Sequence, residues 1–420
     1  MFRKLKAALK QRRREKSIAN ALRLNQQGVL KLKNKNEPIN VAFIVLREAV
    51  WKLDSVYIHM MVSERYNPTI VIAPLKKLPD AERQMNINKA YDWFASRGYQ
   101  VVKGEENGRQ INVRTSLSPD LIFYTNPHND TNSRFYPSGL IGIPSVYVPY
   151  AHQISCYNNY QPQYNQLFHN LMWRIYTTND LDKKIFEDFS DLKGSNVVVT
   201  GYPGIEPLIT SQLEDKVSVW KTQDKSKKRI IWAPHHTIFP GSSLGYSTFI
   251  ANAQFMKALA IKFADQVQFA FKPHPMLYDK LTQHPEWGAK KAQEYYDFWK
   301  DMENTQLEQA DYLVLFYQSD AIVHDSGSFL AEYLYVNKPA MYLSSSQELE
   351  LDSYNPFGKA CLEQYEIGVT KADIEAFVQR VILNEDKYLS VRTEFLKEVL
   401  LPKQLPSIQI MDDLNRSLFG

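Results

Sequence analysis

Hydrophobic and polar positions along the chain alternate between short apolar runs and longer amphipathic stretches. Runs such as Val41–Leu46 and Asp120–Thr125 are almost continuously apolar, as in strands buried on both faces of a parallel sheet. The strands predicted in the first half are 41–46, 69–73, 99–102, 120–125, 144–149, 174–178 and 196–200. Helical stretches at 55–65 and 81–97 separate the first of these strands, and this alternation predicts a parallel α/β sheet.

A second series of the same kind begins after the polar stretch 211–228. Its predicted strands are 229–233, 268–272, 321–324 and 340–343, and its predicted helices are 249–264, 329–336, 371–383, 388–400 and 408–418. The apolar run Tyr312–Phe316 fits either a short strand or the edge of a helix.

The chain has 420 residues. A single hydrophobic core rarely supports a chain of this length, so two domains are expected. The predicted fold class is α/β, with two Rossmann-like β/α domains facing across a cleft. Ligands of such sheets bind outside the carboxyl ends of the strands. The predicted parts are a basic amphipathic segment at 1–37, an N-terminal domain at 38–210, a C-terminal domain at 211–400 and a C-terminal helix at 401–420.

The net charge of +4 hides a strong asymmetry along the chain. Residues 1–35 contain twelve lysines and arginines and one acidic residue, whereas the remainder contains 38 basic and 45 acidic residues. A protein that binds nucleic acid through its body would spread basic groups over a docking surface. The mildly acidic body therefore argues against a nucleic-acid partner.

The sequence also limits the compartment in which the protein acts. No apolar run approaches the roughly 20 residues of a membrane-spanning helix. No apolar stretch follows the basic start, so a secretory signal is not expected. The two cysteines, Cys156 and Cys361, suit neither a disulfide scaffold nor a cysteine-based zinc site. We expect a cytoplasmic protein.

The basic segment 1–35 has two interpretations. Phe2, Leu5 and Leu9 fall at helical spacing among lysines and arginines, as in a helix that lies in the interface of an anionic membrane. The apolar face is thin, however, so a solvated charged tail fits the pattern equally well. The first interpretation places the protein at the inner face of the cell membrane.

The segment from Ala321 to Leu334 is the most informative one for chemistry. An apolar strand runs into the polar turn His324–Ser328, which is predicted to open into a helix. Ser326 and Ser328 can cap that helix or donate hydrogen bonds to a phosphate, and Gly327 permits a tight backbone. Glu332, one turn further on, could accept hydrogen bonds from ribose hydroxyls. Asp325 or Ser326 acting as an ordinary helix cap explains the same residues.

Two further strands of the second half end in polar turns shaped by proline. Lys272 and His274 follow one strand in the sequence Lys-Pro-His-Pro, and either can bind phosphate. His235 and His236 follow another strand after a proline. We expect no metal there, because adjacent residues usually point in different directions and no acidic ligand is close in sequence. Polar residues at three strand ends of one domain indicate a ligand site better than any single motif.

The first half offers one comparable histidine. His152 lies just past the predicted strand 144–149, whose exit is shaped by Pro149. A site histidine and a buried core histidine are equally compatible with this placement. No glycine-rich dinucleotide fingerprint follows the strand 41–46, which disfavours a dehydrogenase.

The second half resembles the CDP-glycerol glycerophosphotransferase family, which makes teichoic-acid-like polymers and has a glycosyltransferase-B (GT-B) fold. The similar segments are Ile230–Ile238, Phe271–Pro275, His324–Leu334 and Asn337–Pro339, with Val197–Pro203 at the end of the first half. The form Asp-Ser-Gly-Ser with Glu332 is also similar to the donor segment of UDP-N-acetylglucosamine 2-epimerases. The donor is therefore left open among CDP-glycerol, CDP-ribitol and a nucleotide sugar.

The resemblance implies a transferase of cell-surface polysaccharide synthesis, with an acceptor domain followed by a donor domain. It moves glycerol phosphate, or another polyol phosphate, from a CDP-activated donor to a hydroxyl of a glycan or lipid-linked, teichoic-acid-like acceptor. His152 corresponds to the family's base and His274 to its Pro-His-Pro histidine. The implied donor-binding residues are Lys272, His235, His236, Asp325, Ser326, Gly327, Ser328 and Glu332.

The mechanism expected from this resemblance needs no cofactor and no metal. The acceptor hydroxyl, deprotonated by His152, attacks the distal phosphorus and CMP leaves. Lys272 and His274 neutralise the developing charge with help from Ser326 and Ser328. The alternatives are a GT-B glycosyltransferase that uses a nucleotide sugar and a non-catalytic nucleotide-binding subunit of a polymer-export complex.

Overall fold

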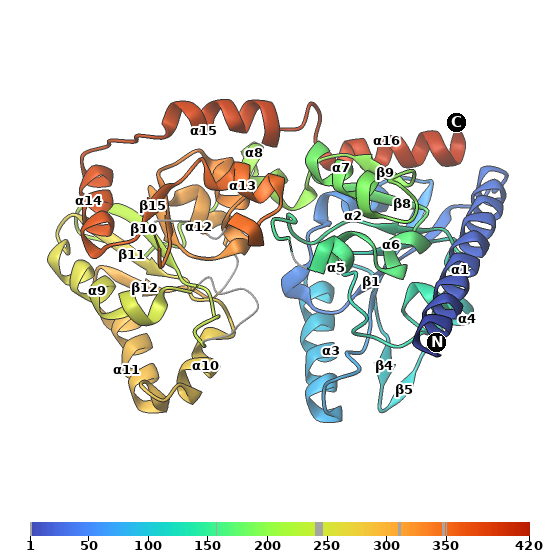
Figure 1. Cartoon of the computed structure of the whole chain (residues 1–420), viewed down its shortest axis with the longest axis horizontal. Helices are drawn as coiled ribbons and strands as arrows, with labels where there is room; N and C mark the ends of the chain where they lie inside the picture. The colour runs from blue at the N-terminus through green and yellow to red at the C-terminus, as the bar shows by residue number, and fades with distance from the viewer. Residues whose placement is uncertain (1, 157, 240–246, 310–311, 347–348, 350) are drawn as a thin grey trace. The chain divides into compact units, whose positions relative to one another are not determined.

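The protein folds into two compact units, each built around a parallel sheet (Figure 1). The computed structural model describes residues 2–156, 158–239, 247–309, 312–346, 349 and 351–420, without the side chains of residues 2–4 and 7. Unit 1 consists of residues 1–152, 157–206 and 402–420, and unit 2 consists of residues 153–156 and 207–401. The α/β fold class predicted from the sequence is confirmed.

Unit 1 contains a sheet of seven parallel strands in the order β3-β2-β1-β6-β7-β8-β9. The strands are β1 (Ile39–Val45), β2 (Tyr66–Ile72), β3 (Val101–Lys103), β6 (Leu121–Tyr124), β7 (Ser145–Tyr147), β8 (Arg174–Thr177) and β9 (Val197–Val199). A short antiparallel hairpin, β4 (Glu105–Glu106) and β5 (Arg109–Gln110), stands apart from this sheet. Every residue of β1 but Asn40 is buried, as its apolar run predicted.

The helices of unit 1 cover this sheet on both faces, because its strands pack into one apolar cluster on each side. They are α1 (Phe2–Lys33), α2 (Asp54–Met61), α3 (Asp80–Ala95), α4 (Val113–Ser116), α5 (Gln161–Tyr164), α6 (Leu167–Leu171), α7 (Asp180–Phe189) and α16 (Pro406–Phe419). In Figure 1 the long helix α1 runs along one side of the unit. Its residues Ile18, Ala21 and Leu32 are buried, so its second half is part of the unit.

The C-terminal helix α16 belongs to unit 1 although it comes last in the sequence. Ile410, Leu414 and Leu418 recur at helical spacing and are buried in the core of the unit. The carboxylate of Glu206 accepts hydrogen bonds from the N–H and hydroxyl groups of Ser407 at 2.5 and 3.0 Å, which fixes the start of the helix. The chain therefore returns to its first unit after completing the second.

Unit 2 contains a sheet of six parallel strands in the order β12-β11-β10-β13-β14-β15. The strands are β10 (Lys228–Ala233), β11 (Val267–Phe271), β12 (Thr305–Leu307), β13 (Ala321–His324), β14 (Ala340–Leu343) and β15 (Glu366–Gly368). The helices are α8 (Glu206–Ile209, at the boundary of the units), α9 (Phe249–Lys262), α10 (Leu277–Gln283), α11 (Gly288–Asp301), α12 (Leu313–Gln318), α13 (Pro356–Leu362), α14 (Lys371–Ile382) and α15 (Leu389–Phe395).

The run Tyr312–Phe316, which fitted either a short strand or the edge of a helix, is helical, because residues from Leu313 form helix α12. Short apolar runs alone do not separate the two structures. One sequence prediction in unit 2 needs correction. The predicted helix 329–336 is instead a pair of 3₁₀ turns, Gly327–Phe329 and Glu332–Val336. Asn337, with φ of 50°, ends the second turn in the left-handed region.

Candidate functional site

The predicted site residues of unit 2 follow the carboxyl ends of adjacent strands. β10 pairs with β11 on one side and with β13 on the other, and Ala233 lies opposite His324 in register. The N–H of His274 donates to the carbonyl of Pro234 at 3.1 Å, which joins the turn after β11 to the turn after β10. The three polar strand ends therefore converge at one edge of the sheet.

Three histidines gather at this edge and form the histidine cluster, His235, His236 and His274. The ring centroids of His235 and His236 are 4.3 Å apart, and that of His274 lies 4.1 Å from His236 and 5.2 Å from His235. The expectation that adjacent residues 235 and 236 point in different directions is wrong. They follow the strand rather than continue it, so the alternation of strand side chains does not apply.

All three imidazoles are held in the neutral state. Burial, with the neighbouring charges of His236, His274 and Lys280, lowers the pKa of His235 to about 3. Burial, with His236 and Lys280, lowers the pKa of His274 to about 3. The pKa of His236 is lowered by burial and by Lys280. At neutral pH the cluster therefore offers neutral rings, and the positive charge beside it resides on Lys280.

The hydrogen bonds of two rings fix where their protons lie. The Nδ1 atom of His274 accepts from the N–H of Met276 at 3.1 Å, and the Nδ1 atom of His236 lies 2.8 Å from the ammonium of Lys280. An ammonium and a backbone N–H can only donate, so both Nδ1 atoms carry a lone pair and both Nε2 atoms carry the proton. His236 and His274 thus present Nε2–H groups, which are donors suited to phosphate oxygens.

The same pattern bears on metal binding. One ring nitrogen from each of the three histidines lies within 4.8 Å of the others, which is close enough for a shared ion. A histidine that binds a metal through one nitrogen normally donates its other N–H to an acceptor. Here the Nδ1 atoms of His236 and His274 face donors instead. With the protons on Nε2, these two rings offer hydrogen-bond donors suited to an anion.

Lys272, predicted to bind phosphate, is buried. Its charge acts on Glu308, whose pKa is raised by burial and drawn back down by a hydrogen bond from Gln306 and by Lys272. A charged side chain that is buried against a carboxylate is partly neutralised by it.

The segment His324–Ser328 lies at the end of β13, and its first two side chains are buried. Burial lowers the pKa of His324 to about 3. Burial raises the pKa of Asp325 to about 7, although hydrogen bonds from Thr248 and His235 act to lower it. One carboxylate oxygen of Asp325 accepts from the N–H of His235 at 2.5 Å. The other accepts from the N–H and the hydroxyl of Thr248 at 2.5 and 3.0 Å. Asp325 therefore joins the end of β13 to the turn after β10 and to the start of α9.

The remaining predicted residues of this segment have simpler surroundings. The hydroxyl of Ser326 accepts from the N–H of Ser328 at 3.3 Å, so Ser326 caps the 3₁₀ turn that begins at Gly327. Gly327 is buried and Ser328 is exposed. The side chain of Glu332 is buried within the second 3₁₀ turn.

His152, the predicted base, lies in unit 1 after β7. Its ring packs edge-on against Tyr202 with centroids 4.8 Å apart. Burial lowers the pKa of His152 to about 3, which keeps the imidazole neutral at ordinary pH. The hydroxyl of Tyr202 donates to the carbonyl of Tyr150 at 2.5 Å, and this bond fixes the ring of Tyr202 that packs against His152.

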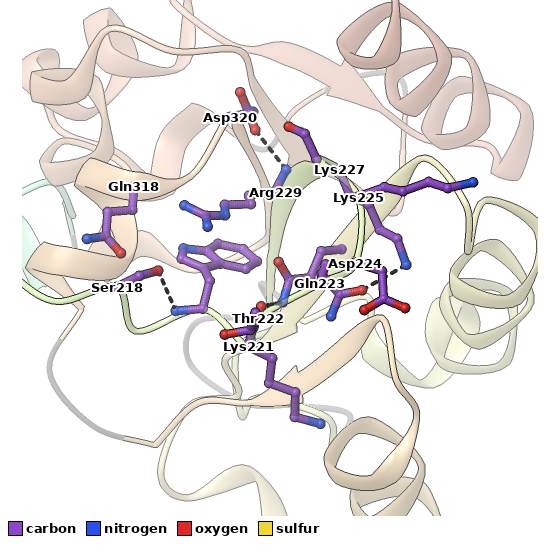
Figure 2. A pocket seen from close by; sticks show the side chains of 13 residues that line it. Ser218, Lys221, Thr222, Gln223, Asp224, Lys225, Lys227, Arg229, Gln318 and Asp320 are labelled. Atoms are coloured by element: carbon purple, nitrogen blue, oxygen red, sulfur yellow. Dashed lines mark hydrogen bonds between the residues drawn. The ribbon is translucent and has the colours of Figure 1, made fainter.

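A cavity of about 540 Å³ lies at the opposite, amino end of the sheet of unit 2 (Figure 2). It is lined by Lys221, Lys225, Arg229, Gln318 and Asp320, among others. Figure 2 shows the charged ends of Lys221, Lys225 and Arg229 pointing in different directions, and Lys221 donates to the carbonyls of Lys300 and Met302. Its cations converge on no single point, so we place the candidate site at the carboxyl end, around the histidine cluster.

Comparison with known protein families shows what this chain is similar to. Residues 156–355 match the family described as CDP-Glycerol:Poly(glycerophosphate) glycerophosphotransferase. This chain is a glycerophosphotransferase-like enzyme. The matched range contains the histidine cluster, Lys280 and Asp325, whereas His152 lies just before it. No curated protein sequence matches the chain.

Solved structures with the same fold support the architecture of this transferase. The wall teichoic acid polymerase TagF is 13% identical with a TM-score of 0.60, and the match covers 98% of this chain and 97% of that one. UDP-GlcNAc 2-epimerase from Neisseria meningitidis is 17% identical with a TM-score of 0.56, covering 90% and 100%. The epimerase from Methanocaldococcus jannaschii is 12% identical with a TM-score of 0.55, covering 90% and 99%. At these identities the likeness establishes the GT-B-like fold alone.

Proposed function

We propose that the enzyme transfers glycerol phosphate from CDP-glycerol to a hydroxyl of a glycan or teichoic-acid-like acceptor in cell-envelope polymer synthesis. The observation that carries the proposal is the histidine cluster at the carboxyl ends of β10 and β11, with two Nε2–H donors and the Lys280 ammonium. Hydrogen-bond donors of this kind suit the pyrophosphate of a nucleotide-activated substrate. The family match and the TagF title point to the same chemistry.

In the proposed reaction an acceptor oxygen attacks the phosphorus that bears glycerol. The new oxygen–phosphorus bond forms, the bond from that phosphorus to the bridging oxygen breaks, and CMP leaves with the bridging oxygen. The role of proton acceptor is assigned to His152 from the resemblance to the family, and burial keeps its imidazole neutral. His274 and His236 donate hydrogen bonds to the charge that develops on the phosphate. Ser326 and Ser328 remain candidates for further phosphate contacts, and no metal takes part.

The first prediction concerns the donor. Purified protein is expected to release CMP from CDP-glycerol in the presence of a glycerol-phosphate primer and to release little UDP from UDP-N-acetylglucosamine. Chromatography of the nucleotides separates the two products, with CDP-ribitol as a second CDP donor. Release of UDP instead of CMP would favour the nucleotide-sugar alternative. Binding of CDP without turnover of any donor would favour a non-catalytic subunit.

The second prediction concerns the basic helix α1, through which we propose peripheral attachment to the inner face of the membrane. Leu5 and Leu9 are 60% and 49% exposed among lysines and arginines, while Ile18, Ala21 and Leu32 in the second half of the helix are buried. No helix in the described part of the chain is long and apolar enough to span a membrane. Burial of two leucines in the lipid interface and about 1 kcal/mol per nearby cation would give reversible binding to anionic lipid.

Sedimentation with phosphatidylglycerol vesicles measures this binding. The wild type is expected to sediment at low salt and to be released as the salt concentration rises. The double variant Leu5→Asp/Leu9→Asp should bind at least about tenfold more weakly, because it loses the apolar contact and adds two repelled charges. Met85→Asp, at a position 67% exposed on α3 of the same unit, is the matched control. Equal sedimentation of all three proteins would contradict the proposal.

A further inference from the structure

Lys280, which no sequence motif marks, is held against the histidine cluster by helix α10. The helix begins directly after the Pro-His-Pro turn, and its residues Leu277 and Leu281 are fully buried in the core of unit 2. The hydroxyl of Tyr278 donates to Gln293 of α11 at 2.7 Å, and its ring packs on Tyr296 with centroids 5.0 Å apart. The docking of α10 therefore fixes the direction from which Lys280 approaches His236.

The positive charge of Lys280 is left without a carboxylate. Within the described residues its one hydrogen-bond partner is the neutral ring of His236, at 2.8 Å, and no ion pair to it occurs there. The side chain is partly buried. A partly buried ammonium faced by neutral donors favours the approach of an anion.

Lys272 is in a different electrostatic position. It is buried and its charge is opposed by Glu308. Replacing Lys272 would remove a buried side chain whose charge acts on the partly buried Glu308, whereas Lys280 lies beside His236 and His274.

We propose that Lys280 supplies the fixed positive charge of the donor site and contacts the donor's phosphate together with His236 and His274. The inference rests on the proposed function for the identity of the donor, since the geometry by itself specifies a phosphate or pyrophosphate. Lys280 has two roles. It neutralises phosphate charge directly, and it holds the Nδ1 lone pair of His236 so that the Nε2–H of that ring points to the ligand.

Calorimetric binding of CDP tests the assignment without requiring turnover. Lys280→Gln is expected to weaken CDP binding by about 10- to 100-fold, the effect of losing a hydrogen bond to a charged group. Lys280→Arg should recover most of the affinity, because it restores the charge. Lys280→Met is a second neutral variant with an apolar stem of similar length. Lys290→Gln, at a position 91% exposed on α11, is the matched control and should bind CDP as the wild type does.

The pH profile of binding separates an electrostatic role from a merely structural one. Lys280 lowers the pKa of His236 and His274, so its removal should let these rings take up protons at higher pH. The pH at which protonation of these rings changes the CDP affinity is therefore expected to be higher in Lys280→Gln than in the wild type. In Lys280→Arg it should return to the wild-type value. Equal affinity and equal profiles for wild type and Lys280→Gln, or no CDP binding by the wild type, would overturn the assignment. CDP binding with no release of CMP from any donor would contradict the proposed function alone.

Discussion

Replacement of His274 by alanine is expected to lower the rate of CMP release from CDP-glycerol by about 100- to 1000-fold, the range measured when one oxyanion donor is removed. The ring is neutral, with its pKa lowered to about 3, and its Nδ1 atom accepts from the N–H of Met276. We therefore expect it to act as a hydrogen-bond donor to the phosphate through Nε2–H rather than as an acid. Steady-state kinetics with saturating donor measures the loss.

Two amide variants test this role of His274. In His274→Gln the amide nitrogen can reach the place of Nε2, so a neutral donor is retained and much of the rate should be recovered. In His274→Asn the amide reaches only the place of Nδ1, and the rate should fall as it does in alanine. Equal loss in both variants would instead indicate proton transfer by the imidazole. His284→Ala is the matched control, because its Nδ1 accepts from the N–H of Glu286 at 3.3 Å while its ring packs on Phe239.

The strands were predictable because burial on both faces leaves an unmistakable apolar run. The predicted strand 321–324 is β13 itself, and the predicted run 41–46 overlaps β1 (Ile39–Val45). β12, with the sequence Thr-Gln-Leu, and β15, with Glu-Ile-Gly, escaped notice because three mixed residues have no measurable period. The helix expected after Ser328 depended on apolar content alone, which does not separate an α-helix from 3₁₀ turns.

The candidate site was predictable as a set of strand ends but not as an arrangement. Parallel strands bring His235 and His274 to one edge, so spacing along the sequence was enough to find them. Lys280 could not be found in this way, because its position depends on how Leu277 and Leu281 dock helix α10 into the core. Thr248, likewise, meets Asp325 only through tertiary packing. Lone polar residues on helices carry no sequence signal of this kind.

Substitution of Asp325 by asparagine is expected to lower the free energy of unfolding by about 2–3 kcal/mol, the cost of leaving a buried donor unsatisfied. Each carboxylate oxygen accepts a backbone N–H, one from His235 and one from Thr248. Whichever way the amide of asparagine turns, its NH₂ group faces one of these donors. Urea unfolding measures the loss. Asp265→Asn, on the exposed loop after α9, is the control and should change the free energy of unfolding little.

The effect should depend on pH in a defined direction. Burial raises the pKa of Asp325 from 3.8 to about 7, so the folded protein binds this proton more tightly than the unfolded chain does. The stability contributed by this group is fully present below pH 3.8 and is lost as pH rises through 7. Asparagine does not titrate, so the difference between wild type and variant should be larger at about pH 5 than at about pH 8. A difference that grows toward alkaline pH would contradict this account.

The same substitution should weaken the donor site, because Asp325 holds the turn that carries His235 and His236. Asp325→Asn is therefore expected to weaken CDP binding at temperatures where the variant is still folded. Thr248→Val removes only the hydroxyl donor, bonded at 3.0 Å, and should cost about 1 kcal/mol with little change in CDP affinity. If Asp325 contacted the donor directly, Asp325→Asn would weaken CDP binding without lowering the free energy of unfolding. The two measurements together therefore distinguish a residue that positions the histidine cluster from one that touches the ligand.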